Sequence, residues 1–168
     1  LVRLVPEPAG RIVGGRVTFA GEDLLQKSPA QMRRVRGKQI AMVLQDPLTS
    51  LNPALTIGTQ VGEVVRLHQG LRGASLRERV LDALRRLRIP AADTRLGHYA
   101  HQFSGGMRQR VSSAIALSCA PRLLIADEPT MALDVTIQAQ YLRLLKEVQA
   151  SAGVAVILVT HDFGIVAA

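Results

Sequence analysis

Polar side chains directly follow several apolar runs of this sequence, at the points where buried strands are expected to end. These side chains belong to Gln45, Asp127, Glu128, Thr160 and His161. Because ligands of open parallel sheets bind beyond the carboxyl ends of the strands, we expect these side chains to share one site. Carboxylate, amide and imidazole groups together suit a metal–phosphate ligand and the activation of a water molecule.

The adjacent acids Asp127 and Glu128 suit different tasks. We expect Asp127 to hold Mg²⁺, mostly through water, because this ion takes few protein ligands and keeps part of its hydration shell. Glu128 is expected to orient or deprotonate an attacking water. His161 is expected to donate a hydrogen bond to a terminal phosphate oxygen, and Gln45 to contact the metal or the water without adding charge.

The stretch Ser104-Gly105-Gly106 suggests a second anion site at the start of a helix. A serine cap followed by glycines lets the backbone approach a ligand closely, and the free N–H groups of a helix N-terminus favour phosphate. An ordinary serine N-cap explains the same residues equally well. Both interpretations therefore stay open at the level of sequence.

Apolar runs predict the strands that position these groups. Residues 39–44, 123–126 and 154–159 read as strands, and the last two runs are apolar throughout, as is typical of parallel strands covered on both faces. An amphipathic helix is expected between these two, with an apolar face formed by Ile137, Tyr141, Leu144, Leu145 and Val148. This order of elements predicts an α/β fold with a parallel sheet.

Turn and capping signals predict further elements. Residues 16–19 alternate as a short strand, and Ser28-Pro29 opens a helix that runs to about Arg36. Residues 56–87 have a helical pattern that is broken at residues 70–73. Another helix is expected to begin directly after the serine of the glycine-rich stretch described above.

Length and composition are those of a folded domain with its own core, since the chain has 168 residues of which 48% are hydrophobic. No apolar run approaches the roughly 20 residues of a membrane span, so a cytoplasmic location is expected. Cys119 is expected to be a small buried hydrophobe. Residues 1–6 read as the last turn of a helix ended by proline, and residues 162–168 as the start of one. We therefore expect an internal piece of a longer protein, incomplete at both ends.

The net charge of +8 permits nucleic acid, an anionic membrane surface or nucleotide phosphates as partners. Basic residues cluster at Arg33, Arg34, Arg36 and Lys38, and again at Arg85, Arg86 and Arg88. Neither cluster has interleaved aromatic residues, which base-stacking surfaces need, and the aromatic content is only 3%. We interpret both clusters as solvated faces and expect no nucleic-acid partner.

Taken in order, several stretches resemble the ATPase subunit of ABC transporters. FSGGMRQR at 103–110 resembles the signature motif, LLIADE at 123–128 resembles Walker B, and ALD at 132–134 resembles the D-loop. His161 is similar to the switch histidine of the H-loop, and Gln45 to the glutamine of the Q-loop. The common order and spacing of these motifs carry more weight than any one of them alone.

Longer stretches resemble the peptide and nickel import branch of that family, which includes the dipeptide and oligopeptide importers. These stretches are QDPLTSLNP at 45–53, HQFSGGMRQR at 101–110 and ADEPTMALDVTIQAQ at 126–140. GRIVGGRVTFAGEDLL at 10–25 is closer to the first of the two ATPase subunits of that branch. A fused double ATPase of this branch is an alternative for the longer protein to which the chain would belong.

The resemblance implies a P-loop NTPase-like ABC ATPase domain with a parallel core sheet, a small β portion and a helical subdomain. Residues 1–55 would form the N-terminal core and β portion, ending in the Q-loop. Residues 56–118 would form the helical subdomain with the signature motif, and residues 119–168 the core sheet with Walker B, the D-loop and the H-loop.

The resemblance also implies that two such domains face each other head to tail with ATP and Mg²⁺ between them. Ser104, Gly105 and Gly106 would bind the ATP of the partner, and Asp134 would cross the dimer interface. The domain's own ATP would be served by Gln45, Glu128 and His161 as catalytic residues, and its Mg²⁺ by Asp127 and Gln45.

The implied partners are a second ATPase subunit, identical or paralogous, two transmembrane permease subunits and, indirectly, a solute-binding protein. The implied location is peripheral, on the cytoplasmic side of the inner membrane. Hydrolysis of ATP would drive the import of dipeptides and oligopeptides, or of related solutes such as nickel. The choice of solute would be made by the other components.

This sequence departs from the family pattern at several positions. Met131 stands where the branch usually has Thr and ABC proteins broadly have Ser, which would weaken a D-loop contact. Met107 replaces the Gln of the general signature, although the branch commonly has Met there, and Ala100 stands where the branch often has Pro.

The phosphate-binding motif GxxxxGK[ST] does not occur in the sequence, since Gly10, Gly14 and Gly15 are not followed by Lys-Ser or Lys-Thr. In the family that loop would lie just upstream of Leu1. The backbone donors and the lysine of the loop are the main cradle of the β and γ phosphates. We therefore expect the chain alone to bind MgATP very weakly and to hydrolyse it negligibly. The alternative is a degenerate interaction module that does not hydrolyse ATP.

Overall fold

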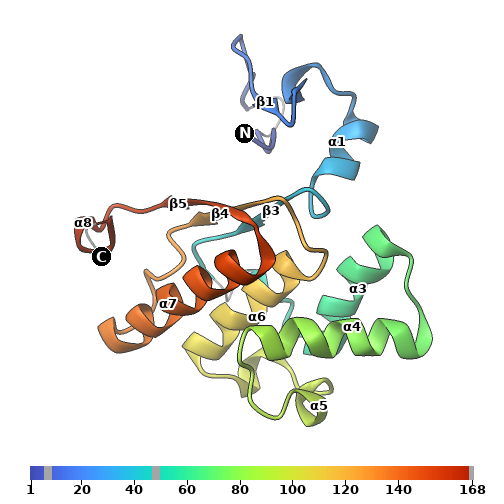
Figure 1. Ribbon diagram of the computed structural model, residues 1–168, viewed down its shortest axis with the longest axis vertical. Helices are drawn as coiled ribbons and strands as arrows, with labels where there is room; N and C mark the ends of the chain where they lie inside the picture. The colour runs from blue at the N-terminus through green and yellow to red at the C-terminus, as the bar shows by residue number, and fades with distance from the viewer. Residues whose placement is uncertain (6–8, 47–49, 167–168) are drawn as a thin grey trace.

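A parallel sheet of three strands, in the order β3-β4-β5, lies at the centre of the protein (Figure 1). This computed structural model describes residues 1–5, 9–46 and 50–166. Strand β3 spans Ile40–Val43, β4 spans Leu123–Asp127 and β5 spans Ala155–Val159. Leu123 pairs with Ile40 on one side and with Ala155 on the other, so the three strands end at the same edge. The predicted α/β fold with a parallel core sheet is confirmed.

Helices α6 (Gly105–Leu117) and α7 (Val135–Ala152) cover one face of the sheet, below it in Figure 1. The core between helices and sheet is formed by Ala41, Val43, Ala116, Leu124, Tyr141, Leu145 and Val154. Tyr141 is only 1% exposed, and its hydroxyl lies 2.7 Å from that of Ser113 on α6. The predicted apolar face of α7 is therefore correct, and a polar contact fixes the two helices to each other.

The N-terminal elements lie on the opposite side of the sheet from α7 (Figure 1). Strands β1 (Thr18–Phe19) and β2 (Glu22–Asp23) form an antiparallel pair, followed by the short helix η1 (Leu24–Gln26) and by α1 (Pro29–Val35). Their core consists of Val2, Leu24, Met32, Val35, Ile40 and Ile125. Ser28 caps α1 in a reciprocal capping box, as its sequence predicts.

Four further helices pack below the sheet around a core that continues into α7. They are α3 (Ile57–Gln69), α4 (Gly73–Arg86), α5 (Ala92–Arg95) and η2 (Ala100–Gln102). The predicted break between α3 and α4 is confirmed, because Gly70 ends α3 with a left-handed φ of 72°. None of the helices in the described parts of the chain combines the length and the hydropathy needed to cross a membrane.

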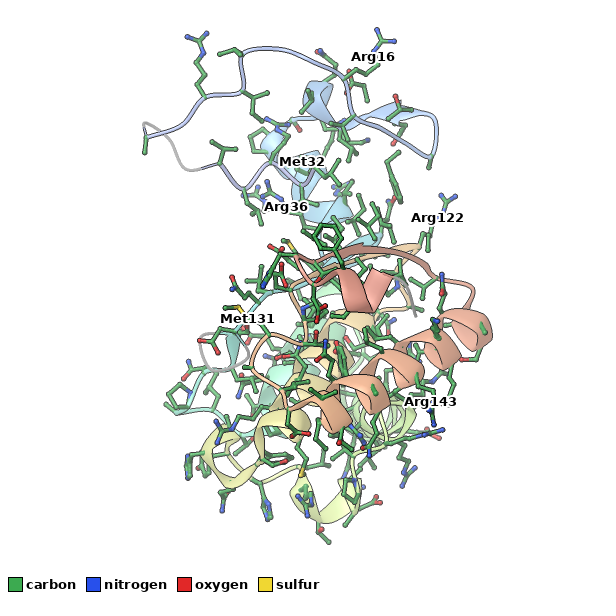
Figure 2. All side chains as sticks on the ribbon, turned by 90° about the vertical axis from the view of Figure 1, so that its left-hand side faces the viewer. Arg16, Met32, Arg36, Arg122, Met131 and Arg143 are labelled. Carbon is green, nitrogen blue, oxygen red and sulfur yellow. The ribbon has the colours of Figure 1, made fainter. Side chains whose placement is uncertain are left out.

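The predicted helical turn at the start of the chain is wrong. Residues 1–5 are not helical, and Arg3 has a left-handed φ of 55°. The guanidinium of Arg36 holds this segment by donating to the carbonyl oxygens of Val2 at 2.8 Å and Arg3 at 2.6 Å. Figure 2 labels Arg36 and Met32 where the N-terminal part approaches the sheet. Pro6, the expected stop, lies outside the described residues, whereas the expected helix after residue 162 is present as α8 (Phe163–Val166).

The expected burial of β5 on both faces is also wrong. The strand itself is present, but Ile157, Leu158 and Val159 are 40%, 37% and 45% exposed. Among the described strands, β5 pairs only with β4 and forms an edge of the sheet. The apolar sequence of β5 allows burial on both faces, but its actual burial depends on which elements pack beside it. Cys119, by contrast, is buried and free, as expected.

Candidate active site

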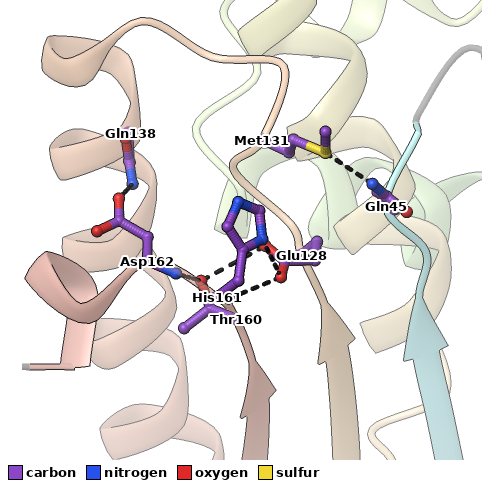
Figure 3. Close-up of polar contacts among 7 residues, drawn as sticks. All are labelled: Gln45, Glu128, Met131, Gln138, Thr160, His161 and Asp162. Atoms are coloured by element: carbon purple, nitrogen blue, oxygen red, sulfur yellow. Dashed lines mark hydrogen bonds and ion pairs between the residues drawn. The ribbon is translucent and has the colours of Figure 1, made fainter.

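The carboxyl ends of the three parallel strands place the predicted polar residues along one edge of the sheet (Figure 3). Asp127 is the last residue of β4, and the backbone N–H of Glu128 donates to Val159 of β5 at 2.9 Å. Gln45 and His161 each follow shortly after the end of a neighbouring strand. The parallel register therefore brings together groups that are far apart in sequence.

Glu128 and His161 form a close polar contact at this edge. One carboxylate oxygen, Oε1, accepts the backbone N–H of His161 at 2.7 Å and lies 2.6 Å from the Nδ1 atom of the same residue. The hydroxyl of Thr160 donates to the other oxygen at 3.4 Å. The side chain of Glu128 is 16% exposed and that of His161 is 73% exposed. The carboxylate is thus mostly buried, and the imidazole is exposed to solvent.

The turn after β4 has an unusual backbone at Glu128, whose φ is 45°. Left-handed conformations are unfavourable for residues other than glycine and often occur at functional sites. The turn is closed by hydrogen bonds from Met131 N–H to the Glu128 carbonyl at 3.3 Å and from Leu133 N–H to the Thr130 carbonyl at 3.0 Å. This backbone directs the Glu128 side chain toward β5.

Gln45 contacts the turn after β4. Its amide Nε2 donates to the sulfur of Met131, which is 61% exposed (Figure 3). The sequence marked Met131 as a departure from the family pattern but gave no sign of this contact. A thioether is a weak acceptor, so the contact orients the amide with little energy.

Asp127 is half-buried at the end of the central strand. Among the residues that the structure describes, no group of three or more His, Cys, Asp or Glu side chains is arranged to hold a metal. A single carboxylate such as that of Asp127 still suits Mg²⁺, because this ion commonly takes one or two carboxylates from the protein and its other ligands from water and phosphate. The residues present therefore fit Mg²⁺ only together with a phosphate ligand.

The glycine-rich stretch forms the N-terminal turn of α6. Ser104 caps this helix, because its hydroxyl accepts the N–H of Met107 at 3.4 Å. Gly105 is exposed, and a Cβ atom built on it would have no neighbour within 4 Å. The predicted cap is confirmed, while an anion-binding role of the same residues stays a prediction.

Asp134 lies at the start of α7, where its carboxylate accepts the N–H of Ile137 at 3.0 Å. Asp134 is therefore the N-cap of α7. From the sequence it was predicted only to be a D-loop residue, and the capping role was not predicted. Asp162 has a similar role that the sequence analysis missed, since its carboxylate accepts the N–H of Gly164 at 2.8 Å before α8. An aspartate directly before a helical pattern is the signal that could have identified both caps.

Comparison with known proteins supports the interpretation of the motifs. The chain is 52% identical to the probable peptide ABC transporter ATP-binding protein y4tR of Sinorhizobium fredii. It is 50% identical to the dipeptide transport ATP-binding protein DppD of Bacillus subtilis. Each alignment covers 167 residues, which are 99% of this chain and 50% of the relative. The chain therefore spans about half the length of these curated relatives.

Solved structures give the same fold. The dimeric structure of MJ0796, a bacterial ABC transporter cassette, matches with a TM-score of 0.76 and 29% identity over 91% of this chain and 65% of that one. CbiO1 from Clostridium perfringens, part of the ABC transporter complex cbiONQ, matches with a TM-score of 0.78 and 30% identity over 92% of this chain and 59% of that one. The family profile described as ABC transporter matches residues 6–131, which is most of the sequence. The chain belongs to the ABC transporter family.

Proposed function

We propose that this chain is part of an ATP-binding subunit that couples the hydrolysis of MgATP to import through an ABC transporter. The cargo that we propose is a dipeptide or oligopeptide, or a related solute such as nickel. The observation that carries the proposal is the pairing of Glu128 with His161 at the carboxyl edge of the sheet, beside Asp127. The relatives named as peptide and dipeptide transport proteins support the cargo class.

Each residue of the edge has a proposed task in hydrolysis. Glu128 orients and deprotonates the attacking water, and its contact with His161 keeps its carboxylate at the strand ends. Asp127 and Gln45 hold Mg²⁺, which would neutralise charge on the phosphates. His161 binds the terminal phosphate through the ring that it exposes to solvent.

The glycine-rich turn serves a second ATPase subunit in this proposal. Ser104, Gly105 and Gly106 bind the ATP of that subunit, and Asp134 lies at the interface between the two. The 13-residue length of α6 and the open space at Gly105 support a phosphate at this N-terminus. The other partners are two permease subunits and, indirectly, a solute-binding protein, with no nucleic acid involved. The subunit works peripherally, on the cytoplasmic side of the inner membrane.

We further propose that residues 1–168 alone hydrolyse ATP negligibly, because the motif GxxxxGK[ST] is absent from this sequence. ATP turnover by the purified chain is compared with that of the protein expressed from its full reading frame. Turnover by the full protein alone supports the transporter subunit. Absence of turnover in both favours the alternative, an interaction module that does not hydrolyse ATP.

The substitution Glu128→Gln tests the catalytic proposal in the protein from the full reading frame. It removes the proton acceptor but keeps the shape of the side chain, so we expect kcat to fall by about a hundredfold or more. Dimers that retain ATP should persist in size-exclusion chromatography. Glu147→Gln is the matched control, because Glu147 is an exposed residue of α7 paired with Arg88. Unchanged turnover in the Glu128 variant would exclude that residue as the base.

A further inference from the structure

The N-terminal turn of α6 approaches the first turn of α7 more closely than a side chain at position 106 allows. A Cβ atom built on Gly106 would lie 2.7 Å from Cγ2 of Ile137, whereas ordinary van der Waals contacts are 3.4–4 Å. Gly106 has no left-handed backbone, since it is not among the residues with positive φ. Close packing against Ile137 therefore leaves no room for a β-carbon at position 106.

Ile137 also contacts the cap of its own helix. Its backbone N–H donates to the carboxylate of Asp134 at 3.0 Å, while its side chain lies against Gly106. One residue thus touches both the glycine-rich turn of α6 and the aspartate that begins α7. In the sequence, Ile137 is recognisable only as one member of an apolar helix face.

We propose that Ile137 is a positioning residue for the anion-binding turn. Its Cγ2 methyl sets how closely the turn containing Ser104 and Gly106 approaches α7, and its backbone ties this arrangement to Asp134. The inference rests on the proposed function, in which this turn binds the ATP of a second subunit. An added methyl at Gly106 would force the turn away by about 0.7 Å to restore a 3.4 Å contact, and errors of about 1 Å are known to cost up to about a hundredfold in rate.

Gly62 of α3, outside the proposed ATP sites, provides a control. A Cβ atom on Gly62 would lie 3.6 Å from Cγ2 of Val80, an ordinary van der Waals distance, so Gly62→Ala adds a methyl to a helix without a collision. Substitutions of Ile137 show whether an effect of Gly106→Ala comes from the collision with the Ile137 methyl. Ile137→Ala removes the colliding methyl, whereas Ile137→Val keeps a methyl at the same place.

The experiment measures kcat and KM for ATP hydrolysis in the protein from the full reading frame. The variants are Gly106→Ala, Gly106→Ala with Ile137→Ala, Gly106→Ala with Ile137→Val, and the control Gly62→Ala. We expect Gly106→Ala to lower kcat by about tenfold or more. Adding Ile137→Ala should recover most of this loss, and adding Ile137→Val should recover none. If Ile137 were merely structural, the Ala double variant would be less active than Gly106→Ala, because the packing of the half-buried Ile137 side chain is lost as well.

Each outcome decides between clear alternatives. Equal loss in Gly106→Ala and in both double variants would overturn the role of Ile137 and leave the proposed function intact, since the glycine would then be needed only for phosphate approach. A Gly62→Ala control as impaired as Gly106→Ala, with no recovery from Ile137→Ala, would lead to the same conclusion. If the unmodified protein shows no ATP hydrolysis, the proposed function fails, and the positioning role fails with it.

Discussion

One oxygen of the Glu128 carboxylate accepts the backbone N–H of His161 at 2.7 Å and lies 2.6 Å from the Nδ1 atom of the same residue. A neutral imidazole that donates from Nδ1 has Nε2 as an acceptor. A neutral His161 that donates to a phosphate must therefore release its ring from Glu128, while its backbone N–H keeps the contact with the carboxylate.

The substitution His161→Ala should lower kcat by about a hundredfold, because removal of a hydrogen-bond donor to the reacting phosphate commonly costs about 10²–10³ in rate. The backbone N–H of residue 161 would still contact Glu128, so the fold should change little. His161→Gln keeps a side-chain donor and should retain part of the activity. ATP turnover at saturating ATP is the measurement. Turnover of the Ala variant within about twofold of the parent would contradict the role of the ring.

The substitution Met131→Thr should raise kcat by about fivefold, the factor that corresponds to one hydrogen bond of about 1 kcal/mol. Threonine offers a hydroxyl in place of the weak sulfur acceptor that now orients Gln45. Because Met131 is 61% exposed, the free energy of unfolding should change by less than about 0.5 kcal/mol. Steady-state ATP turnover and urea unfolding measure the two quantities.

Met131→Leu is the control for this prediction. It removes the sulfur acceptor without adding a hydroxyl, so it should not raise kcat. A rise of the same size in both variants would show that release of Gln45, rather than the new hydroxyl, increases turnover.

Features that depend on neighbouring residues in the chain could be predicted from the sequence. The helix caps at Ser28 and Ser104 are examples, because the hydroxyl and the N–H that it accepts lie within one turn. The shared edge of Gln45, Glu128 and His161 could also be predicted, since parallel strands in register end together.

Features that depend on contacts across the fold could not be predicted. Residues 1–5 take their shape from Arg36, a residue far along the chain. The exposure of β5 depends on which strands lie beside it, and its apolar sequence does not contain this information. The contact between Gly106 and Ile137 depends on how α6 and α7 approach each other over the sheet.

The substitution Arg36→Lys should loosen the N-terminal segment. A lysine cannot reproduce the forked donation of the guanidinium to the carbonyls of Val2 and Arg3, and the loss should cost about 1 kcal/mol of stability. Amide hydrogen exchange in residues 1–5 and 9–17 should become faster. Arg34→Lys is the control, because Arg34 is an exposed arginine of α1, the helix that ends directly before Arg36. Equal exchange in the two variants would contradict the anchoring role of Arg36.

The phenol of Tyr141 should make the folded state less stable at alkaline pH. Burial raises the pKa of Tyr141 above its ordinary value of 10.0, although the hydrogen bond with Ser113 acts in the opposite direction. Below pH 10 the hydroxyl is protonated in the folded and unfolded states alike. Above pH 10 the unfolded chain releases the proton and the folded chain keeps it, so the free energy of unfolding falls by up to about 1.4 kcal/mol per pH unit.

The substitution Tyr141→Phe removes this titration. The variant should be less stable than the parent at pH 8, by about 1 kcal/mol for the lost hydrogen bond, and its stability should fall less steeply above pH 10. Urea unfolding of both proteins between pH 8 and pH 11 measures the two slopes. Tyr99→Phe is the control for loss of a phenol, because Tyr99 is 38% exposed. Parallel curves for the parent and the Tyr141 variant would mean that Tyr141 ionises as readily in the folded chain as in the unfolded one.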